Sequence, residues 1–419
     1  MKLVLTMAVR SLLRHRWRTG LAAGGIAVAA VMLIWNLAFI DGFYEAMIRS
    51  TTDVEIGHVQ VQHRDYVDRP STLDYFEWDE ELDREVSQVA GVQGLTPRVR
   101  LFGIIGHEDR SYISRIMGVD AQRERSVSLL AESVSQGRWL SDEARDELPA
   151  EAVIGVGLSR ALDVGLGDEL VVIAEGADGS MGDSLLEVVG ILESGNSAVD
   201  RQAALIHFEE AQYVAAVEGA AHELIITTAD PTLAPEIASR VQATLNGMER
   251  DELQARPWQE VTPGLYEMLA LGEQSNFIIF LVIAFIVALG VLNVLRMSAR
   301  ERYREFGVML SVGLSRSRLF AMILVESLAL GIIGAAVGAA AGGALSHYHA
   351  TEGLDLGAFM EGDATYMGIS MSDRLYFVVS PETILFPAIG LVVVTVLCAL
   401  WPAIAAIGLE PRDAITGRQ

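Results

Sequence analysis

The stretch RMSARERYREFGVMLSVGLSRSRLFAMILVE, residues 296–326, decides the fold of this chain, and we call it the elbow. It lies between two long apolar stretches and carries most of the charge that separates them. Within it, residues at i, i+3, i+4 and i+7 are apolar or small, which is the spacing of one helix face. These residues are Phe306, Met309, Leu310 and Gly313. The opposite face is charged, so the elbow predicts a short amphipathic helix at a membrane surface.

The end of this helix is marked by Gly313. Glycine readily adopts the left-handed conformation that closes many helices. Ser315 or Ser317 can then cap a new helix, whose apolar body starts at Leu319. The elbow therefore predicts a helix, a corner and a membrane-spanning helix, in this order.

The composition is that of a membrane protein with a large soluble part. Of the 419 residues, 51% are hydrophobic, which is more than an ordinary soluble protein carries. Four stretches are long enough to cross a bilayer, because about 20 apolar residues span its core of about 30 Å. They are residues 19–40, 274–295, 319–346 and 383–409, and Glu326 is the charged residue among them.

Basic residues predict which side of the membrane each segment occupies. They gather before the first apolar stretch, between the second and the third, and after the fourth. Loops rich in Arg and Lys stay in the cytoplasm, so we expect both termini and the elbow there. Residues 41–273 and 347–382 then lie outside. We expect the first apolar stretch to remain as an anchor, since its 22 residues exceed the usual core of a cleaved signal peptide.

The outer segment, residues 41–273, is strongly acidic. It holds 17 Arg and 44 acidic residues, a net charge of −27, whereas the rest of the chain has a net charge of +3. This balance argues against nucleic acid as a partner. The single cysteine, Cys398, lies in the fourth apolar stretch, so no disulfide can stabilise the outer segment.

Patterns within the outer segment predict an α+β domain. Strands and helices alternate in residues 53–119 and 203–257, as in a βαβ-type subdomain. Residues 120–202 carry short strands and glycine-rich turns and predict a β-rich insert. The loop 175–184 joins two of these strands and is expected to be a hairpin tip.

The sequence offers no site for nucleotide hydrolysis. A phosphate-binding loop needs a lysine after its glycines, and the only lysine of the chain is Lys2. The His-Glu-x-x-His and paired-Cys metal spacings and the G-x-S-x-G nucleophile motif are also missing from the sequence. His347 and His349, with Glu352 and Asp355 nearby, could contact a metal, but we expect them to be solvated loop residues. We therefore expect a chain that is not an enzyme and holds no metal or cofactor.

Glu326 is an acid within an apolar span, where charged side chains are costly and often functional. It follows Leu319 by seven residues, about 10 Å along a helix, which places it near the cytoplasmic interface. We expect Arg296 or Arg300 as its partner, with the transmission of motion or a proton relay as alternatives. A glycine stripe follows at every fourth position and permits close helix packing or sliding. Its members are Gly334, Gly338 and Gly342.

Residues 301–338, ERYREFGVMLSVGLSRSRLFAMILVESLALGIIGAAVG, resemble the signature of the FtsX-like permease family of ABC transporters. The shared pattern is Glu-Arg, Glu-Phe-Gly, a small-Gly-x-Ser turn and a Glu before a glycine-rich span. The opening AVRSLLRHRWRT and the closing LWPAIAAIGLEPRDAI extend the resemblance to both ends. In the outer segment, GHVQVQHRDY, IMGVDAQRE and VIGVGLSRALDVGLGDEL resemble the LolC/LolE lipoprotein-releasing branch of MacB-type permeases.

This resemblance implies a multi-pass inner-membrane protein with four transmembrane helices, both termini inside and a large periplasmic domain. It also implies an ABC ATPase subunit in two copies per complex, which would bind the ATP and Mg. A second permease subunit would complete a homodimer or a heterodimer, and a periplasmic carrier or adaptor would receive the cargo. The alternatives are a MacB-like efflux permease, a non-transporting FtsX-like coupler of a periplasmic enzyme, and a membrane-anchored enzyme.

In permeases of this family, an amphipathic coupling helix lies in a groove of the ATPase, which implies roles for residues of the elbow. Phe306, Met309 and Leu310 would be apolar anchors, with Gly313 at the corner. The polar register would be set by Glu301, Arg302, Arg304 and Glu305. A periplasmic hairpin grips the carrier in the lipoprotein-releasing branch, and the candidate here is the tip that contains Gly176, Gly179, Met181 and Gly182.

Patterns and resemblance together divide the chain into nine consecutive parts. We expect a cytoplasmic amphipathic N-terminus (1–18), a first span (19–40), a periplasmic domain (41–273), a second span (274–295), a cytoplasmic coupling helix (296–318), a third span (319–346), a periplasmic loop (347–382), a fourth span (383–409) and a cytoplasmic tail (410–419).

Overall fold

The computed structural model of the chain describes residues 16–66, 71–145, 148–355, 365–366, 369–370 and 374–408. The chain forms two compact units. The helical unit comprises Met1–Glu45, Leu269–Asp355 and Arg374–Gln419, and the sheet unit comprises Ala46–Met268 and Leu356–Asp373. The predicted tail, most of the predicted N-terminus and 14 of the 36 residues of the predicted loop 347–382 lie outside the described residues.

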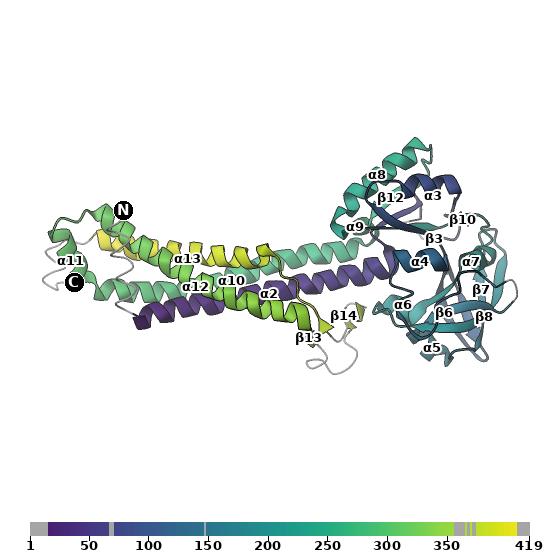
Figure 1. The fold of residues 1–419 in the computed structure, drawn as a ribbon, viewed down its shortest axis with the longest axis horizontal. Helices are drawn as coiled ribbons and strands as arrows, with labels where there is room; N and C mark the ends of the chain where they lie inside the picture. The colour runs from purple at the N-terminus through teal and green to yellow at the C-terminus, as the bar shows by residue number, and fades with distance from the viewer. Residues whose placement is uncertain are drawn as a thin grey trace. The chain divides into compact units, whose positions relative to one another are not determined.

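Four long helices and one short helix build the helical unit (Figure 1). The long helices are α2 (Arg16–Thr51), α10 (Pro263–Glu301), α12 (Arg316–Glu352) and α13 (Pro381–Ile407), and the short one is α11 (Tyr303–Ser311). Each long helix contains a window of mean hydropathy 2.1 or more and is long enough to cross a membrane. The prediction of four apolar spanning helices is therefore confirmed.

The core of the helical unit takes apolar side chains from all four long helices. Its buried members are Ala22, Ile26, Ala29, Ala30, Leu33, Phe280, Ala284, Val291, Leu330 and Leu391. Many of them are small, as is usual where helices pack closely in a membrane.

The glycine stripe of α12 lies against α2. A Cβ atom on Gly334 would come within 2.8 Å of the Ala23 carbonyl oxygen, and one on Gly338 would come within 2.5 Å of the Ala30 Cβ. On Gly342 it would come within 3.0 Å of the Val31 Cα. The absence of side chains at these three positions thus lets the backbones of α12 and α2 approach each other.

The sheet unit is built on one sheet of ten strands. Its strands are β1 (Val59–His63), β3 (Val92–His107), β4 (Arg110–Val119), β5 (Val134–Gly137), β6 (Ala150–Gly155), β7 (Glu169–Glu175), β8 (Met181–Leu192), β9 (Ala203–His207), β11 (Glu223–Thr228) and β12 (Leu253–Pro257). The helices around it are η1 (Thr52–Ile56), α3 (Glu80–Ser87), α4 (Ala121–Val127), α5 (Val156–Leu162), α6 (Ser197–Gln202), α7 (Phe208–Ala215), η2 (Pro231–Leu233), α8 (Ala234–Gly247) and α9 (Trp258–Val261). Short strand pairs of the sheet unit are formed by β2 (Phe76–Glu77) with β10 (Ala220–Ala221) and by β14 (Thr365–Tyr366) with β15 (Ile369–Ser370). A further pair, β13 (Leu354–Asp355) with β16 (Arg374–Leu375), belongs to the helical unit.

The sixteen-residue strand β3 lies inside this sheet and pairs with three other strands. Its first half pairs with β11, and its second half pairs with β7, while β4 runs antiparallel along its other edge. Along the sheet the strands follow the order β12-β1-β11-β3-β4-β9-β6-β8-β5, and β7 pairs with both β3 and β8. Strands β3 and β4 form an antiparallel hairpin, in which Arg98 lies opposite Val119 and His107 lies opposite Arg110.

The strands of both predicted subdomains belong to this one sheet. We predicted an insert, residues 120–202, with strands of its own, and β5, β6, β7 and β8 fall within it. However, β9 pairs with β4 on one side and with β6 on the other, and β7 pairs with β3. Hydrogen bonds between strands therefore continue across the predicted boundary.

Candidate functional site

The elbow contains the predicted helix, corner and second helix. Helix α10 ends at Glu301, and α11 follows after Arg302. Gly313 has a φ of +97°, and the backbone N–H groups of Gly313 and Leu314 donate to carbonyl oxygens of α11 over 3.1 and 3.0 Å. Ser315 is the N-cap of α12. Gly313 thus has the predicted left-handed conformation at the corner. Ser315 occupies the predicted N-cap position, although its side chain makes no capping hydrogen bond to α12.

The apolar face of α11 is buried within the chain itself. Phe306 is only 1% exposed and packs with Leu319, Met322, Ile323, Ala403 and Ala406 of α12 and α13. Met309 and Leu310 lie half-buried against the same cluster. We expected Phe306, Met309 and Leu310 to anchor another protein, but Phe306 presents no surface to one. The helical spacing identifies a face that must be buried, and here α12 and α13 bury it.

Arg302 holds the start of α11 to the third span. Its Nη1 donates to both carboxylate oxygens of Glu326, over 3.0 and 2.8 Å, and the Arg302 side chain is almost completely buried. The guanidinium also lies 5.1 Å from the centre of the Phe306 ring and 3.4 Å from Glu305. Such a charge-assisted pair with two bonds is a strong local link when both partners are shielded from water.

The predicted partners of Glu326 were wrong. We expected Arg296 or Arg300, but the guanidinium of Arg296 lies 5.0 Å from the centre of the Trp401 ring. The chain bends at Arg302, between α10 and α11, and this bend turns the Arg302 side chain toward α12. The pair borders a cavity of about 30 Å³, which has room for a water molecule.

The opposite face of α11 is exposed. Val308 is 53% exposed and Val312, just beyond the helix end, is 84% exposed. Arg304 and Ser311 are exposed on the same face, because these positions follow the helical spacing, and Glu301 at the end of α10 is exposed as well. The two valines were missed by sequence reasoning. Their separation by four residues within the charged face was the signal that could have identified them.

Within the sheet unit, a network of buried charges fixes η1 to the strands β3 and β4. Glu55 of η1 pairs with Arg115 of β4 and lies 3.5 Å from Arg100 of β3. Arg98, on the same strand, donates to the Glu55 carbonyl oxygen and pairs with Glu124, and neither Arg98 nor Glu124 is exposed. Sequence reasoning missed this network, although charged residues at alternate positions of an apolar strand mark it.

The predicted tip between β7 and β8 is confirmed as a hairpin. The N–H of Gly176 donates to the Ser180 carbonyl oxygen over 2.9 Å, and Gly179 has a φ of +81°. Met181 is 65% exposed, whereas Gly182 lies against Val214 of α7. The tip therefore offers one exposed apolar side chain, that of Met181, on a tight turn.

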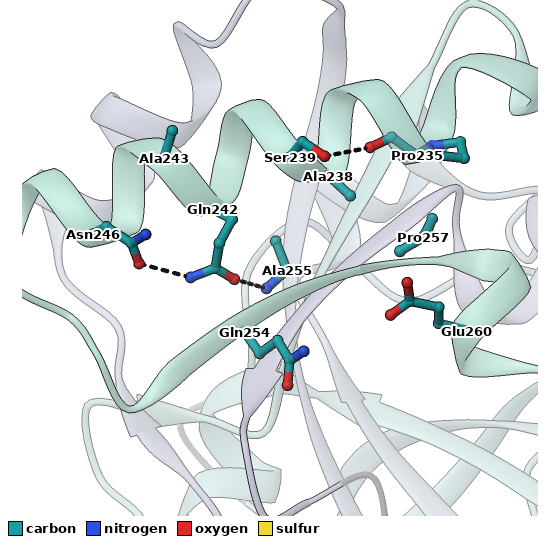
Figure 2. Close-up of a pocket in the computed structure, with 10 residues that line it drawn as sticks. All are labelled: Pro235, Ala238, Ser239, Gln242, Ala243, Asn246, Gln254, Ala255, Pro257 and Glu260. Carbon is teal, nitrogen blue, oxygen red and sulfur yellow. Dashed lines mark hydrogen bonds between the residues drawn. The ribbon is translucent and has the colours of Figure 1, made fainter.

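A groove of about 460 Å³ lies between α8 and the edge strand β12 (Figure 2). In it, the Gln242 Oε1 accepts the N–H of Ala255 over 2.9 Å, and the Gln242 Nε2 donates to Asn246 Oδ1 and to the Leu253 carbonyl oxygen. The Gln242 amide thus takes the place of a neighbouring strand, and Pro257 has no N–H to offer. The groove is a protected sheet edge.

Comparison of the chain with known proteins identifies its family. Residues 19–264 match the MacB-like periplasmic core domain, and residues 277–411 match the FtsX-like permease C-terminal domain. The chain is 22% identical to the lipoprotein-releasing system transmembrane protein LolC of Neisseria meningitidis serogroup B, over 77% of this chain and 76% of that protein. It is 20% identical to the lipoprotein-releasing system transmembrane protein LolE of Haemophilus influenzae, over 94% and 93% of the two chains.

Among solved structures, the periplasmic region of MacB from Actinobacillus actinomycetemcomitans is similar with a TM-score of 0.38 and 12% identity, covering 52% of this chain and 95% of that one. The family matches and the four apolar helices identify an inner-membrane protein with a periplasmic domain. The chain belongs to the family of ABC transporter permeases that combine a MacB-like periplasmic core domain with an FtsX-like C-terminal domain, to which LolC and LolE also belong.

Proposed function

We propose that this chain is the permease subunit of a transporter that releases lipoproteins, or another lipid-linked cargo, from the inner membrane with energy from a separate ATPase. The elbow carries the proposal, because it is a short helix fixed to the spans on one face and exposed on the other. The names of the relatives LolC and LolE support the choice of cargo.

The ATPase binds, in this proposal, to the exposed face of α11. Arg304 and the two valines Val308 and Val312 give this face an apolar strip beside a positive charge. Burial of the valine side chains contributes binding energy in proportion to the apolar area removed from water. Arg is among the residue types that contribute most to protein interfaces. The earlier candidates on the other face, Phe306 with Met309 and Leu310, then have the role of attaching α11 to the spans.

Movement of α11 is passed to the third span through the Arg302–Glu326 pair and the Phe306 cluster. Both contacts lie within the helical unit and connect α11 with α12. A short helix that is packed on one side moves with the helices it contacts, because closely packed side chains transmit displacement. The pair therefore makes α11 and α12 respond together when the ATPase subunits close.

The arrangement in the membrane follows the basic residues. Both termini and α11 lie in the cytoplasm, and the sheet unit lies in the periplasm. Two ATPase copies, which hold ATP and Mg, bind a dimer of this chain or a heterodimer with a second permease. Extraction of lipid chains from a bilayer needs about 0.8 kcal/mol per CH₂ group, so ATP energy and an apolar acceptor, such as a periplasmic carrier, are required.

Co-purification tests the docking surface. Val308→Asp places a charge in the exposed strip without disturbing the core, so we expect it to abolish co-purification of the ATPase subunit with the chain. The matched control is Tyr348→Asp, at the other end of α12, where Tyr348 is 58% exposed. Unchanged complex formation by Val308→Asp would contradict the proposed surface.

Release from proteoliposomes tests the cargo. Vesicles that contain the permease, its ATPase and a lipoprotein should transfer the lipoprotein to a soluble acceptor when ATP is added. A MacB-like efflux permease, which the periplasmic core domain also fits, would instead move small apolar compounds across the vesicle membrane. ATP hydrolysis without either movement would favour a mechanical coupler.

A further inference from the structure

One face of the sheet unit carries an apolar surface that no helix among the described residues covers. Helix α7 packs against β3, β4, β7 and β8 on the side of the buried Ile105 and Val172. Side chains alternate along a strand, so the neighbouring residues point to the other side. There Phe102 is 62% exposed and Ile113 is 72% exposed. The surface therefore results from the alternation of β3 and β4 beyond the part of the sheet that η1 and α4 cover.

The exposed side chains form a continuous row across three strands. Ile104 of β3 lies directly opposite Ile113 of β4 on one side and Ile173 of β7 on the other. Residues in this relation have Cβ atoms about 5 Å apart and contact each other. Phe102 and Val171 extend the row along β3 and β7, and Ile104, Val171 and Ile173 are 49, 44 and 40% exposed. Soluble proteins seldom leave such a contiguous patch free unless another molecule binds it.

Acidic residues border this apolar row on the same face. Asp183 of β8 lies directly opposite Ile173, and Glu169 and Glu175 flank Val171 and Ile173 along β7. All three acids are exposed. A second copy of this face would bring the same negative charges into contact, and the anionic surface of a membrane would be repelled as well. The charge pattern fits a partner with positive charge around an apolar centre.

We propose that this face binds a separate periplasmic protein whose contact surface is apolar and ringed by Lys and Arg. The face consists of Phe102, Ile104, Ile113, Val171 and Ile173, with Asp183 at its border. The inference rests on the proposed function, because a permease that releases an apolar cargo needs a periplasmic protein to receive it. The burial of the five apolar side chains supplies the binding energy, and the acids favour the correct orientation and a fast encounter.

The partner is identified first by a photo-crosslink in cells. The full chain carries p-benzoylphenylalanine in place of Ile113, or, as control, in place of Tyr213 on α7, which is 67% exposed. We expect the Ile113 position to yield an adduct with a basic periplasmic protein that the Tyr213 position does not yield. An adduct with a second copy of this chain, with lipid alone, or with nothing above the control level would overturn the proposal.

Binding of the identified protein to the full chain in nanodiscs then decides the case. We expect Ile113→Asp to weaken binding at least tenfold, Asp183→Lys to weaken it about threefold, and Tyr213→Asp to leave it unchanged. A rise in salt from about 50 to 300 mM should weaken binding of the wild type but have less effect on Asp183→Lys. Equal binding by Ile113→Asp would refute the inference.

The same preparations separate this inference from the proposed function. If Ile113→Asp still co-purifies with the ATPase and hydrolyses ATP, the permease assembly is intact and only the periplasmic contact has been tested. Loss of the ATPase from wild-type chain would count against the proposed function instead. Because Ile113 is mostly exposed, its substitution should leave the melting temperature within about 2 °C of that of the wild type.

Discussion

Arg302 is the side chain that joins the short helix α11 to the membrane spans. Sequence reasoning identified Glu326 as an unusual acid and expected an arginine beside it, which is the correct kind of partner. It could not identify which arginine, because the bend after α10 sets the direction of each side chain. A bend of this kind leaves no repeating pattern in the sequence. The inward turn of Phe306 was missed for the same reason. Helical spacing groups residues on one face but does not tell which neighbour covers that face.

Glu326→Gln should lower the stability of the detergent-solubilised chain by about 3 kcal/mol, because it removes the carboxylate to which the buried Arg302 Nη1 donates two hydrogen bonds. Thermal unfolding measures this loss. The matched control is Glu305→Gln, whose side chain is 41% exposed and lies 3.4 Å from Arg302, and it should have an effect below about 1 kcal/mol. The exchange Arg302→Glu with Glu326→Arg should recover part of the loss, and no recovery would show that the pair does not act as a unit.

Glu151 should make the stability of the sheet unit depend on pH. Burial alone would raise its pKa, but hydrogen bonds from Arg138 and Ser141 more than offset this and lower the pKa to about 2. Because an unfolded Glu titrates near pH 4.3, the stabilisation is complete above about pH 5 and is lost as the pH falls toward 2.

Melting curves of the full chain between pH 7 and pH 3 check this prediction. Glu151→Gln should lower the melting temperature at pH 7 and flatten its decrease toward pH 3. The exposed Glu218→Gln is the control and should reproduce the wild-type curve. Identical curves for wild type and Glu151→Gln would contradict the assigned role of the pair with Arg138.

The third spanning helix shows what a residue pattern can predict for a whole element. Its apolar length and its glycines at every fourth position predicted a spanning helix with a close-packed face. The structure assigns that face to α2, which sequence spacing alone could not do, since the same stripe would fit any neighbouring helix. The elbow is a similar case. Its helix, corner and next helix were predicted, but the face of α11 that is exposed was not.

Gly338→Ala should destabilise the helical unit, because its new Cβ would lie 2.5 Å from the Ala30 Cβ and 2.6 Å from the Ala27 carbonyl oxygen. We expect the melting temperature in detergent to fall by at least about 4 °C. Gly290→Ala on α10 is the matched control, since nothing lies within 4 Å of its Cβ position. It should be neutral or slightly stabilising. A similar loss in both variants would show that helix α12 does not depend on this contact.

For the molecule as a whole, sequence reasoning predicted four spans, a large outer domain and the permease family. It divided the outer domain into two subdomains because the residues alternate differently in the two regions. The single sheet was not foreseen, since the long strand β3 pairs at its two ends with β11 and β7, which are far apart in the sequence. Pairing between distant strands depends on tertiary structure and leaves no local pattern.

Protection of a cysteine at the elbow tests the central claim most directly, that the ATPase binds the exposed face of α11 in the cytoplasm. Cys398 is the chain's only cysteine, so Cys398→Ala gives a background in which Val308→Cys or Tyr348→Cys is labelled alone. A membrane-impermeant maleimide applied from the cytoplasmic side should label Val308→Cys, and bound ATPase should slow this labelling at least tenfold. Tyr348→Cys should react only from the periplasmic side and ignore the ATPase. Labelling of Val308→Cys from the periplasmic side, or at a rate that bound ATPase does not change, would contradict the account.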